Sequence, residues 1–365
     1  MNKQISYIIE TFFLISALIL VLAAPNTVIN GVGKGLVICA ETILPVLFLF
    51  MLISSFLADS KAADIISLPL LPLTKYLLRI PQNLGCMVLL SMLGGYPVGA
   101  KIISQLYNEE KISKRQVEHL LCFCCNPSPA FAISAVGVKL MGDVSCGIVI
   151  YVSALLSALL IGAVLSENNH QTAVEYSTEF KCVPFSSRVI IAMNNTISAT
   201  VVMCGFVLLF SAFTEFLNLL NPIIWTLLPY GEYIKYLIYG VTEVTVGCME
   251  CSAASIDVQL ILMPFLTAFS GCSVMFQVMA MFKSKSDISF KPFITSRFAH
   301  GILTTMISFP FLKRKFAVAS VLKMYSAPVP AVSENSLFIV LFACGMCCML
   351  FLKAAQLQLD AKNLL

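Results

Sequence analysis

Charged side chains lie inside long apolar stretches of this sequence. Lys101 follows a glycine-rich apolar segment, Glu243 stands among valines and threonines, and Arg297 precedes His300 by three residues. A charge inside a bilayer is costly, so such residues usually face a cavity or a partner and mark a functional site. They predict a polar site at membrane depth, although Glu243 and Arg297 could instead pair with each other for structure alone.

The first of these charges follows a predicted break in an apolar helix, at Gly94-Gly95-Tyr96-Pro97. Glycine tolerates backbone angles that other residues avoid, and proline removes one N–H donor. Lipid cannot satisfy freed backbone groups, so the break must be surrounded by protein or by a water-filled cavity. The half-helix that resumes near Val98 would direct its unpaired N–H groups into that cavity, which suits an anion. The alternative is a proline-kinked structural helix.

A second break is expected at Cys125-Asn-Pro-Ser-Pro129, because two prolines this close cannot sit in an uninterrupted helix. Asn126 and Ser128 supply polar side chains there. We interpret this segment as unwound backbone that lines a cavity. The alternative is an ordinary loop at the membrane edge.

The composition requires a membrane for most of the chain. Of 365 residues, 59% are hydrophobic and 12% are charged, with a mean hydropathy of +0.91. Soluble domains are about half apolar and about a quarter charged. The net charge of +4 is spread over short loops, which argues against a nucleic-acid partner. The sequence therefore predicts an all-α polytopic membrane protein with the lipid bilayer as its surroundings.

Apolar segments place the membrane spans, since about twenty helical residues cross the hydrocarbon. Clear spans are expected at 11–33, 42–58, 144–166, 189–214 and 335–352. Interrupted spans are expected at 80–100, 120–138 and 258–282, and a short one at 298–312. The predicted organisation is a first helix (1–34), a first repeat (35–165), a polar linker (166–187), a second repeat (188–311) and a basic connection with a last helix (312–365).

A gapless match between 90–113 and 266–289 suggests two repeats, expected in inverted orientation, each with a broken or re-entrant segment. Gly95 matches Gly271, and both copies interrupt an apolar run with small residues. Paired interruptions of this kind indicate the binding site of a transporter. We predict that 90–101 and 266–277 meet near the bilayer centre about a pseudo-two-fold axis. The alternative is two unrelated helices that both contain glycine.

The sequence offers little support for an enzyme, a metal site or a cofactor. No H-E-x-x-H or G-x-S-x-G motif occurs, so we expect no catalytic activity. Most of the fourteen cysteines lie in apolar runs, where a thiol behaves as a small hydrophobe. Cys248 and Cys251 have C-x-x-C spacing, but no second ligand pair accompanies them, and we expect both to be free and without metal.

Five stretches of the chain resemble the YlbJ-type sporulation integral membrane proteins: Gly94–Lys101, Glu118–Asn126, Glu243–Cys248, Phe269–Gln277 and Arg297–His300. The resemblance covers about residues 35 to 305, with departures at Cys125, Ser270 and Cys272. It implies two nucleoside-recognition (Gate) domains and a role in endospore formation. It also implies delivery of dipicolinic acid, a small aromatic dicarboxylate, to the forespore across the mother-cell-derived outer forespore membrane.

Together these observations predict a transporter or facilitator of a small anionic aromatic solute, with dipicolinic acid as the expected solute. Other interpretations are a transporter of nucleosides or other small solutes, and a non-transporting scaffold for spore formation. A second copy of the chain and other sporulation membrane proteins are further partners to consider. The predicted solute-binding residues are Gly94, Gly95, Tyr96, Pro97, Gly99, Lys101, Asn126, Ser128, Glu243, Ser270, Gly271, Ser273, Gln277 and Arg297.

Overall fold

The computed structural model describes residues 21–58, 61–166, 185–227, 231–282 and 287–322, together with positions 11, 15, 18 and 19. The predicted span 335–352 and most of the predicted linker 166–187 lie outside these residues. The chain divides into two compact units, Met1–Lys313 and Arg314–Leu365. The site lies in the first unit.

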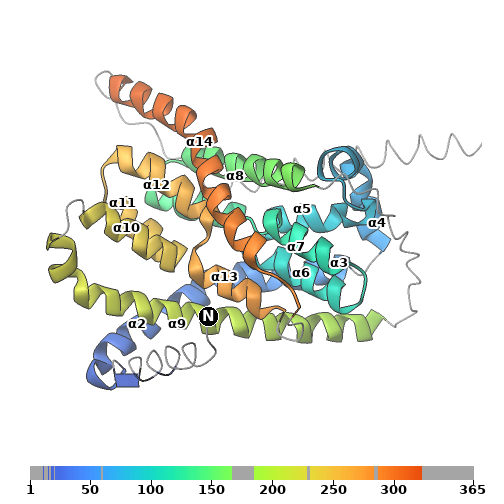
Figure 1. Cartoon of the computed structure of the whole chain (residues 1–365), viewed down its shortest axis with the longest axis horizontal. Helices are drawn as coiled ribbons and strands as arrows, with labels where there is room; N and C mark the ends of the chain where they lie inside the picture. The colour runs from blue at the N-terminus through green and yellow to red at the C-terminus, as the bar shows by residue number, and fades with distance from the viewer. Residues whose placement is uncertain are drawn as a thin grey trace, which may run out of the picture. The chain divides into compact units, whose positions relative to one another are not determined.

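Every regular element in the described ranges is helical, which confirms the all-α fold class (Figure 1). The α-helices are α2 (Pro25–Ile38), α3 (Leu49–Ala58), α4 (Lys61–Ser67), α5 (Gly85–Gly94), α6 (Tyr96–Asn108), α7 (Lys114–Phe123), α8 (Val144–Leu165), α9 (Phe185–Leu227), α10 (Gly231–Thr242), α11 (Val244–Ser252), α12 (Ile256–Phe269), α13 (Gly271–Ala280) and α14 (Lys291–Leu322). Wider π-helical segments are η1 (Cys39–Phe48), η3 (Leu73–Leu78) and η5 (Ala130–Leu140), and short 3₁₀ turns are η2 (Leu68–Leu70) and η4 (Gln82–Leu84).

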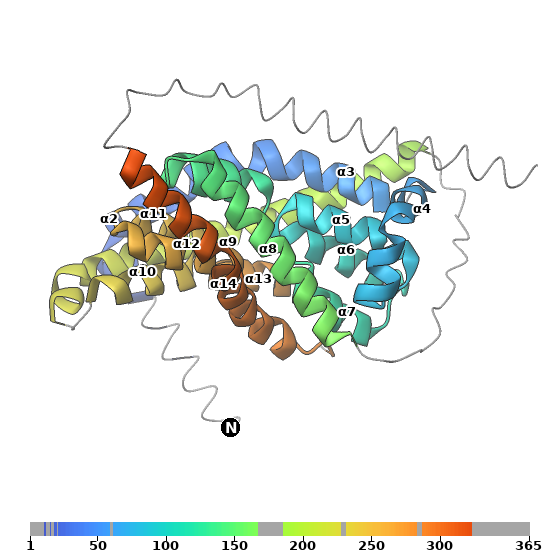
Figure 2. The same cartoon turned by 90° about the horizontal axis from the view of Figure 1, so that it is seen from above.

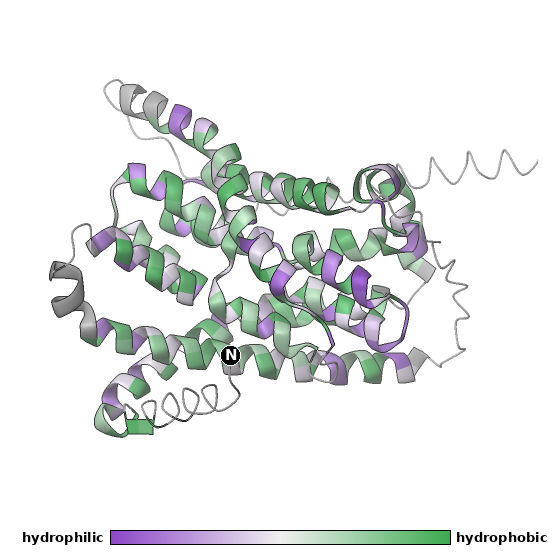
Figure 3. Cartoon of the chain, viewed as in Figure 1, coloured by the Kyte–Doolittle hydropathy of each residue, from purple (hydrophilic) through white to green (hydrophobic). Residues whose placement is uncertain are grey.

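In the ranges that the structure describes, three helical segments are long and apolar enough to cross a membrane: Val144–Leu165, Ser186–Leu219 and Ile256–Ala280. Large apolar side chains point outward along the helices, among them Leu22, Val164 and Met306. Hydrophobic colours accordingly cover most of the ribbon, and hydrophilic colours gather in short stretches (Figure 3). Lipid accounts for these exposed side chains, so the chain is a polytopic membrane protein.

Two helices are longer than the sequence analysis predicted. Helix α9 begins at Phe185, inside the predicted linker, and α14 continues through Pro310 to Leu322. The predicted short span 298–312 and the first residues of the predicted segment 312–365 therefore belong to one helix. Lys and Arg favour helix, and proline is tolerated in membrane helices because neighbouring groups satisfy the freed carbonyl.

Helix α6 lies between elements of the two halves of the chain. It packs against α5 and α7, its neighbours in sequence, and against α3 and the distant α13. The long helix α9 contacts α2, α3, α10 and α13 along its length (Figures 1 and 2). The breaks in the first and second halves therefore meet around α6.

Candidate functional site

The two matched apolar segments are both interrupted at the aligned position. Helix α5 ends at Gly94, and Gly95 adopts a φ of +90° before α6 begins. Helix α12 ends at Phe269, followed by Ser270 with a φ of +76° and Gly271 with a φ of +77°. Both broken helices are therefore confirmed. The pseudo-two-fold relation and the inverted orientation of the halves remain predictions.

The two broken helices contact each other through α6. The Tyr96 hydroxyl donates to the carbonyl oxygen of Thr267 at the end of α12. Two turns further along α6, the Ser104 hydroxyl donates to the Met281 carbonyl oxygen over 2.6 Å. These bonds attach α6 to the end of α12 and to the end of α13, which lie on either side of the break at Ser270.

Residues 125–128 are unwound and buried, which confirms the predicted break, and the cavity that they would line remains a prediction. Helix α7 ends at Phe123 and η5 begins at Ala130. Cys125 and Asn126 between them are fully buried, so this is not a loop at the membrane edge. The Asn126 amide donates to the Phe123 carbonyl over 2.8 Å, and the Ser128 hydroxyl accepts from the Phe131 N–H over 3.2 Å. These polar side chains therefore satisfy backbone groups that the break releases.

Gly99 allows α6 to approach this unwound segment closely. A Cβ atom at Gly99 would lie 1.9 Å from the Cys124 carbonyl oxygen, and one at Gly95 would lie 3.1 Å from the Ser128 Cβ. A side chain at Gly99 therefore cannot be accommodated without moving the backbone. The two breaks of the first half form one packed unit.

A fourth break, which the sequence analysis did not predict, separates α10 from α11 at Glu243. This residue is extended, and its buried carboxylate accepts from the Val246 N–H over 2.7 Å, capping α11. A Cβ at Gly271 would lie 3.1 Å from the Val244 nitrogen, so this break packs on the second matched break. The signal in the sequence was the β-branched run between Gly240 and Gly247, which disfavours a continuous helix.

Arg297, on α14, is fully buried and reaches the unwound segment of the first half. Its Nη1 donates to the Cys125 carbonyl oxygen, and its Nη2 donates to the Cys122 carbonyl oxygen over 2.5 Å. Within the described part of the chain the guanidinium has no carboxylate partner, and its Nε has no hydrogen bond. The structural pair with Glu243 considered above is therefore not formed.

His300 fixes the orientation of the guanidinium. Its Nε2 lies 2.8 Å from the Ala154 carbonyl oxygen, an acceptor, so this nitrogen carries the hydrogen. Its Nδ1 therefore has a free lone pair, and it accepts from Arg297 Nη1 over 3.2 Å. A neutral imidazole with the hydrogen on Nε2 satisfies both contacts, so α8 supports the arginine through His300.

Lys101 lies apart from this cluster. Its ammonium donates to the Thr196 hydroxyl of α9 over 2.7 Å and to the Met51 carbonyl oxygen of α3 over 3.4 Å. Gly99 and Lys101 are two residues apart on a helix, which separates their side chains by about 200°. Gly99 faces the unwound segment that Arg297 contacts, so Lys101 points away from it. This geometry does not support the expectation that Lys101 and Arg297 both contact one solute.

The remaining predicted residues lie on α13 and at its start. Ser270 is fully buried, and its hydroxyl has no partner within the described ranges. The Gln277 amide donates to the Ser273 hydroxyl over 3.2 Å, one turn apart. The structure thus brings these predicted residues to the meeting breaks: Gly94, Gly95, Tyr96, Pro97, Gly99, Asn126, Ser128, Glu243, Ser270, Gly271 and Arg297.

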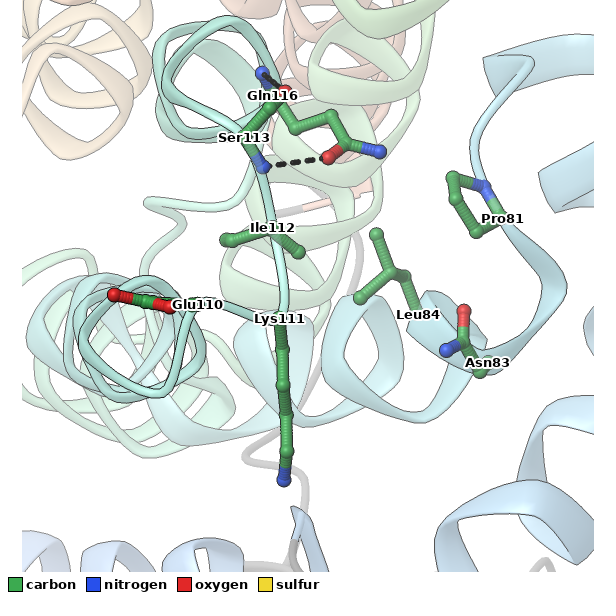
Figure 4. A pocket seen from close by; sticks show the side chains of 8 residues that line it. All are labelled: Pro81, Asn83, Leu84, Glu110, Lys111, Ile112, Ser113 and Gln116. Carbon is green, nitrogen blue, oxygen red and sulfur yellow. Dashed lines mark hydrogen bonds between the residues drawn. The ribbon is translucent and has the colours of Figure 1, made fainter. Parts of the chain in front are cut away.

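A surface pocket of about 200 Å³ lies elsewhere, at the ends of the helices (Figure 4). Its lining comes from Pro81 and the 3₁₀ turn η4, which precede α5, and from the connection between α6 and α7 with the first turn of α7, including Leu84 and Ile112. The residues at the breaks do not line it. We therefore place the candidate site at the breaks, where the buried charge is, and not in this pocket.

Cys248 and Cys251 are buried, unbridged thiols on α11. The described residues contain no cluster of His, Cys, Asp or Glu that could hold a metal ion. The absence of metal from purified protein remains a prediction.

The comparisons with known proteins agree with the resemblance seen in the sequence. Residues 40–144 match the Gate family, described as nucleoside recognition. The chain is also 25% identical over 335 residues to the sporulation integral membrane protein YlbJ of Bacillus subtilis (strain 168), covering 83% of this chain and 81% of the relative. No solved structure matches the chain significantly. The Gate match includes both breaks of the first half, and a second Gate domain in the other half remains a prediction.

Proposed function

We propose that this protein carries a small anionic solute across a membrane during spore formation. The observation that carries the proposal is Arg297, a fully buried cation without a carboxylate partner among the described residues, set where broken helices meet. A charge in a membrane protein is retained at such a cost only where it serves a partner or a solute. A non-transporting scaffold would need only the contacts that Arg297 makes with the protein, which leaves its unpartnered Nε without a role.

The neighbouring groups suit a solute with a carboxylate. The Nε of Arg297 and the hydroxyl of Ser270 are donors without partners in the described ranges. Helices α6 and α13 begin at the breaks, so their first N–H groups and positive dipole ends lie there as well. The carboxylate of Glu243 would oppose an anion, but it is engaged as the cap of α11, which offsets part of its charge.

Dipicolinic acid is the solute we favour, because it is a small aromatic dicarboxylate. The Tyr96 and Phe131 rings meet edge to face next to the breaks, with 6.2 Å between their centroids, and offer an aromatic surface. The relative's name supplies the link to sporulation. We place the protein in the outer forespore membrane, where it would deliver the solute to the forespore.

A nucleoside is the second candidate, because the matched family is described by nucleoside recognition. A nucleoside is uncharged and is bound through hydrogen bonds to its base and sugar. The Oδ1 of Asn126 is a buried acceptor without a partner in the described ranges, and Glu243 offers carboxylate oxygens. This alternative leaves the charge of Arg297 without a role in solute binding.

Flux in proteoliposomes tests the proposal. Purified full-length protein would be reconstituted, and the uptake of labelled dipicolinate and labelled uridine compared with protein-free liposomes. We expect protein-dependent, saturable uptake of dipicolinate. Uptake of uridine alone would favour the nucleoside, and the absence of flux for both would overturn the transport proposal in favour of a scaffold.

A variant pair on α14 tests the role of the arginine. Arg297→Gln removes the buried charge, whereas Lys291→Gln removes an exposed charge from the first turn of the same helix. We expect dipicolinate uptake per folded molecule to fall at least tenfold in the first variant and to stay unchanged in the second. Equal uptake by both would remove Arg297 from the solute site.

A further inference from the structure

Lys101 forms the centre of a second buried polar cluster, separate from the breaks. Its side chain is 5% exposed and lies between α3, α6 and α9. The hydrogen-bond partners of its ammonium are the Thr196 hydroxyl and the Met51 carbonyl oxygen. In the described part of the chain no carboxylate pairs with it, so both partners are neutral.

Buried hydroxyls without partners continue this cluster along both helices. Ser54 and Ser55 lie one turn after Met51 on α3, and Thr200 lies one turn after Thr196 on α9. All three hydroxyls are buried and have no hydrogen-bond partner among the described residues. Residues one turn apart share a helix face, so these hydroxyls lie on the faces that hold Lys101.

The hydroxyls flank the lysine on opposite sides. The guanidinium of Arg188, near the start of α9, lies over the Phe56 ring at 5.3 Å, while Lys101 joins Met51 to Thr196. Helices α3 and α9 therefore run antiparallel, so Ser54 and Ser55 lie toward one end of the bundle and Thr200 toward the other. Buried hydroxyls without partners therefore lie along α3 and α9 on both sides of the lysine.

Other charged and titratable groups around Lys101 are few. The ten residues of α3 contain none, and on α9 Arg188 and Cys204 lie two turns to either side of Thr196. Cys86 on α5 and Cys272 on α13 belong to other helices that pack on α6, and α7 covers its opposite side. Among these, the lysine amine is the group best suited to carry an exchangeable proton.

We infer that Lys101 is a proton carrier that couples transport by this protein to a proton gradient. This inference rests on the proposed transport function. The Thr196 hydroxyl can accept a hydrogen bond from an ammonium and can donate one to a neutral amine, so the contact survives in both states. The proton would arrive from water on one side, convert the amine to the ammonium, and leave to water on the other side. No other bond is made or broken.

Three variants separate a proton carrier from a fixed charge. Lys101→Arg keeps the positive charge but cannot release a proton, since the guanidinium stays protonated. Thr196→Val removes the hydroxyl that serves both states, and Thr196→Ser restores it. If Lys101 only balanced the charge of a solute, Lys101→Arg would keep its response to the gradient.

The experiment measures two kinds of flux in proteoliposomes, with labelled dipicolinate and labelled uridine as probes. Exchange of solute across the membrane at equal pH reports on solute binding, and accumulation driven by an inward proton gradient reports on coupling. For the wild type we expect accumulation of the transported solute, with alkalinisation outside followed by a pH-sensitive dye. In Lys101→Arg we expect accumulation to fall at least tenfold while exchange stays within about twofold. Thr196→Val should lose part of the accumulation and Thr196→Ser should keep it.

Each other outcome has a separate meaning. Wild-type exchange of a solute without any response to the gradient would overturn the inference and leave the transport function standing. Loss of exchange together with accumulation in Lys101→Arg, with normal thermal stability, would overturn it by making Lys101 a solute contact. Full accumulation in Lys101→Arg would overturn it as well. Absence of flux for both probes in the wild type would overturn the proposed function and this inference together.

Discussion

The hydroxyl of Tyr96 donates a hydrogen bond to the carbonyl oxygen of Thr267, a residue 171 positions away. Thr267 is the third residue from the end of α12, so the N–H that would normally pair with its carbonyl lies beyond the break. Tyr96 is the first residue of α6, immediately after the other break. The side chain that follows one break therefore supplies the donor that the other broken helix has lost, and this bond links the two breaks.

Removal of this bond should loosen the contact between the breaks. In Tyr96→Phe the ring remains and the Thr267 carbonyl loses its donor, at a cost of about 1–3 kcal/mol for a buried unsatisfied group. We expect a lower melting temperature in detergent together with reduced solute flux. Tyr107→Phe, on the same helix but at its exposed end, serves as the control and should change both little. Unchanged stability in Tyr96→Phe would show that the bond does not hold the breaks together.

The breaks at Gly95, at Cys125–Pro129 and at Ser270–Gly271 could be predicted from sequence because glycine and proline act locally. Gly95 and Gly271 adopt a positive φ, and Pro127 and Pro129 remove donors, so each break is encoded at its own position. The break at Glu243 has no proline and was not predicted, because its carboxylate caps α11 only once the chain has turned there. Local propensity does not reveal such a cap.

The direction of Lys101 could not be predicted for a different reason. Spacing shows that it lies two residues after Gly99, but which side of α6 faces the unwound segment depends on tertiary packing. The carbonyl of Cys124 occupies the Gly99 side, and Thr196 receives the ammonium on the other. Sequence therefore identified the buried charges, and the fold decided that they serve separate clusters.

Close packing at Gly99 predicts a severe effect of the smallest substitution. In Gly99→Ala the new methyl group would lie 1.9 Å from the Cys124 carbonyl oxygen, so the helix or the unwound segment must move. We expect the free energy of unfolding to fall by about 1–3 kcal/mol, the usual cost of overpacking, and the protein to accumulate poorly in the membrane. Gly205→Ala is the matched control, because nothing lies within 4 Å of its Cβ position on α9. Equal melting temperatures for the two variants would contradict the packing described here.

The cap at Glu243 predicts a difference between two substitutions. Glu243→Gln keeps an oxygen that can accept from the Val246 N–H, whereas Glu243→Ala leaves this N–H without its partner. Loss of a helix cap costs about 0.5–2 kcal/mol. We expect the melting temperature of the alanine variant to fall below that of the glutamine variant. An equal loss in both variants would show that the carboxylate charge, rather than the cap, holds the break at Glu243.

The thiols on α11 should be unreactive and without metal. Cys248 and Cys251 are fully buried, and the described residues offer no further ligands beside them. We expect less than one zinc ion per chain by elemental analysis of protein purified without added metal. A thiol reagent should label the partly exposed Cys272 in the folded protein before it labels either of these cysteines. Stoichiometric zinc, lost in Cys248→Ser, would contradict this assignment.

Arg297 should have two separable roles, which a graded series of substitutions can distinguish. Its guanidinium donates to the carbonyls of Cys122 and Cys125, both released at the end of α7, and in the proposed function its charge also attracts the solute. Arg297→Met removes both roles and leaves two buried acceptors unsatisfied, at about 1–3 kcal/mol each, so this variant should fold poorly.

Arg297→Lys keeps the charge but cannot form the two-pronged contact. We expect it to fold with a lower melting temperature and to retain part of the flux. Arg297→Gln can still donate to one carbonyl, so it should resemble the lysine variant in stability while losing dipicolinate uptake. Melting temperature and uptake per folded molecule, measured on the same preparations, decide the matter. If the glutamine and lysine variants show equal uptake, the arginine serves the fold alone, and the anion must bind elsewhere.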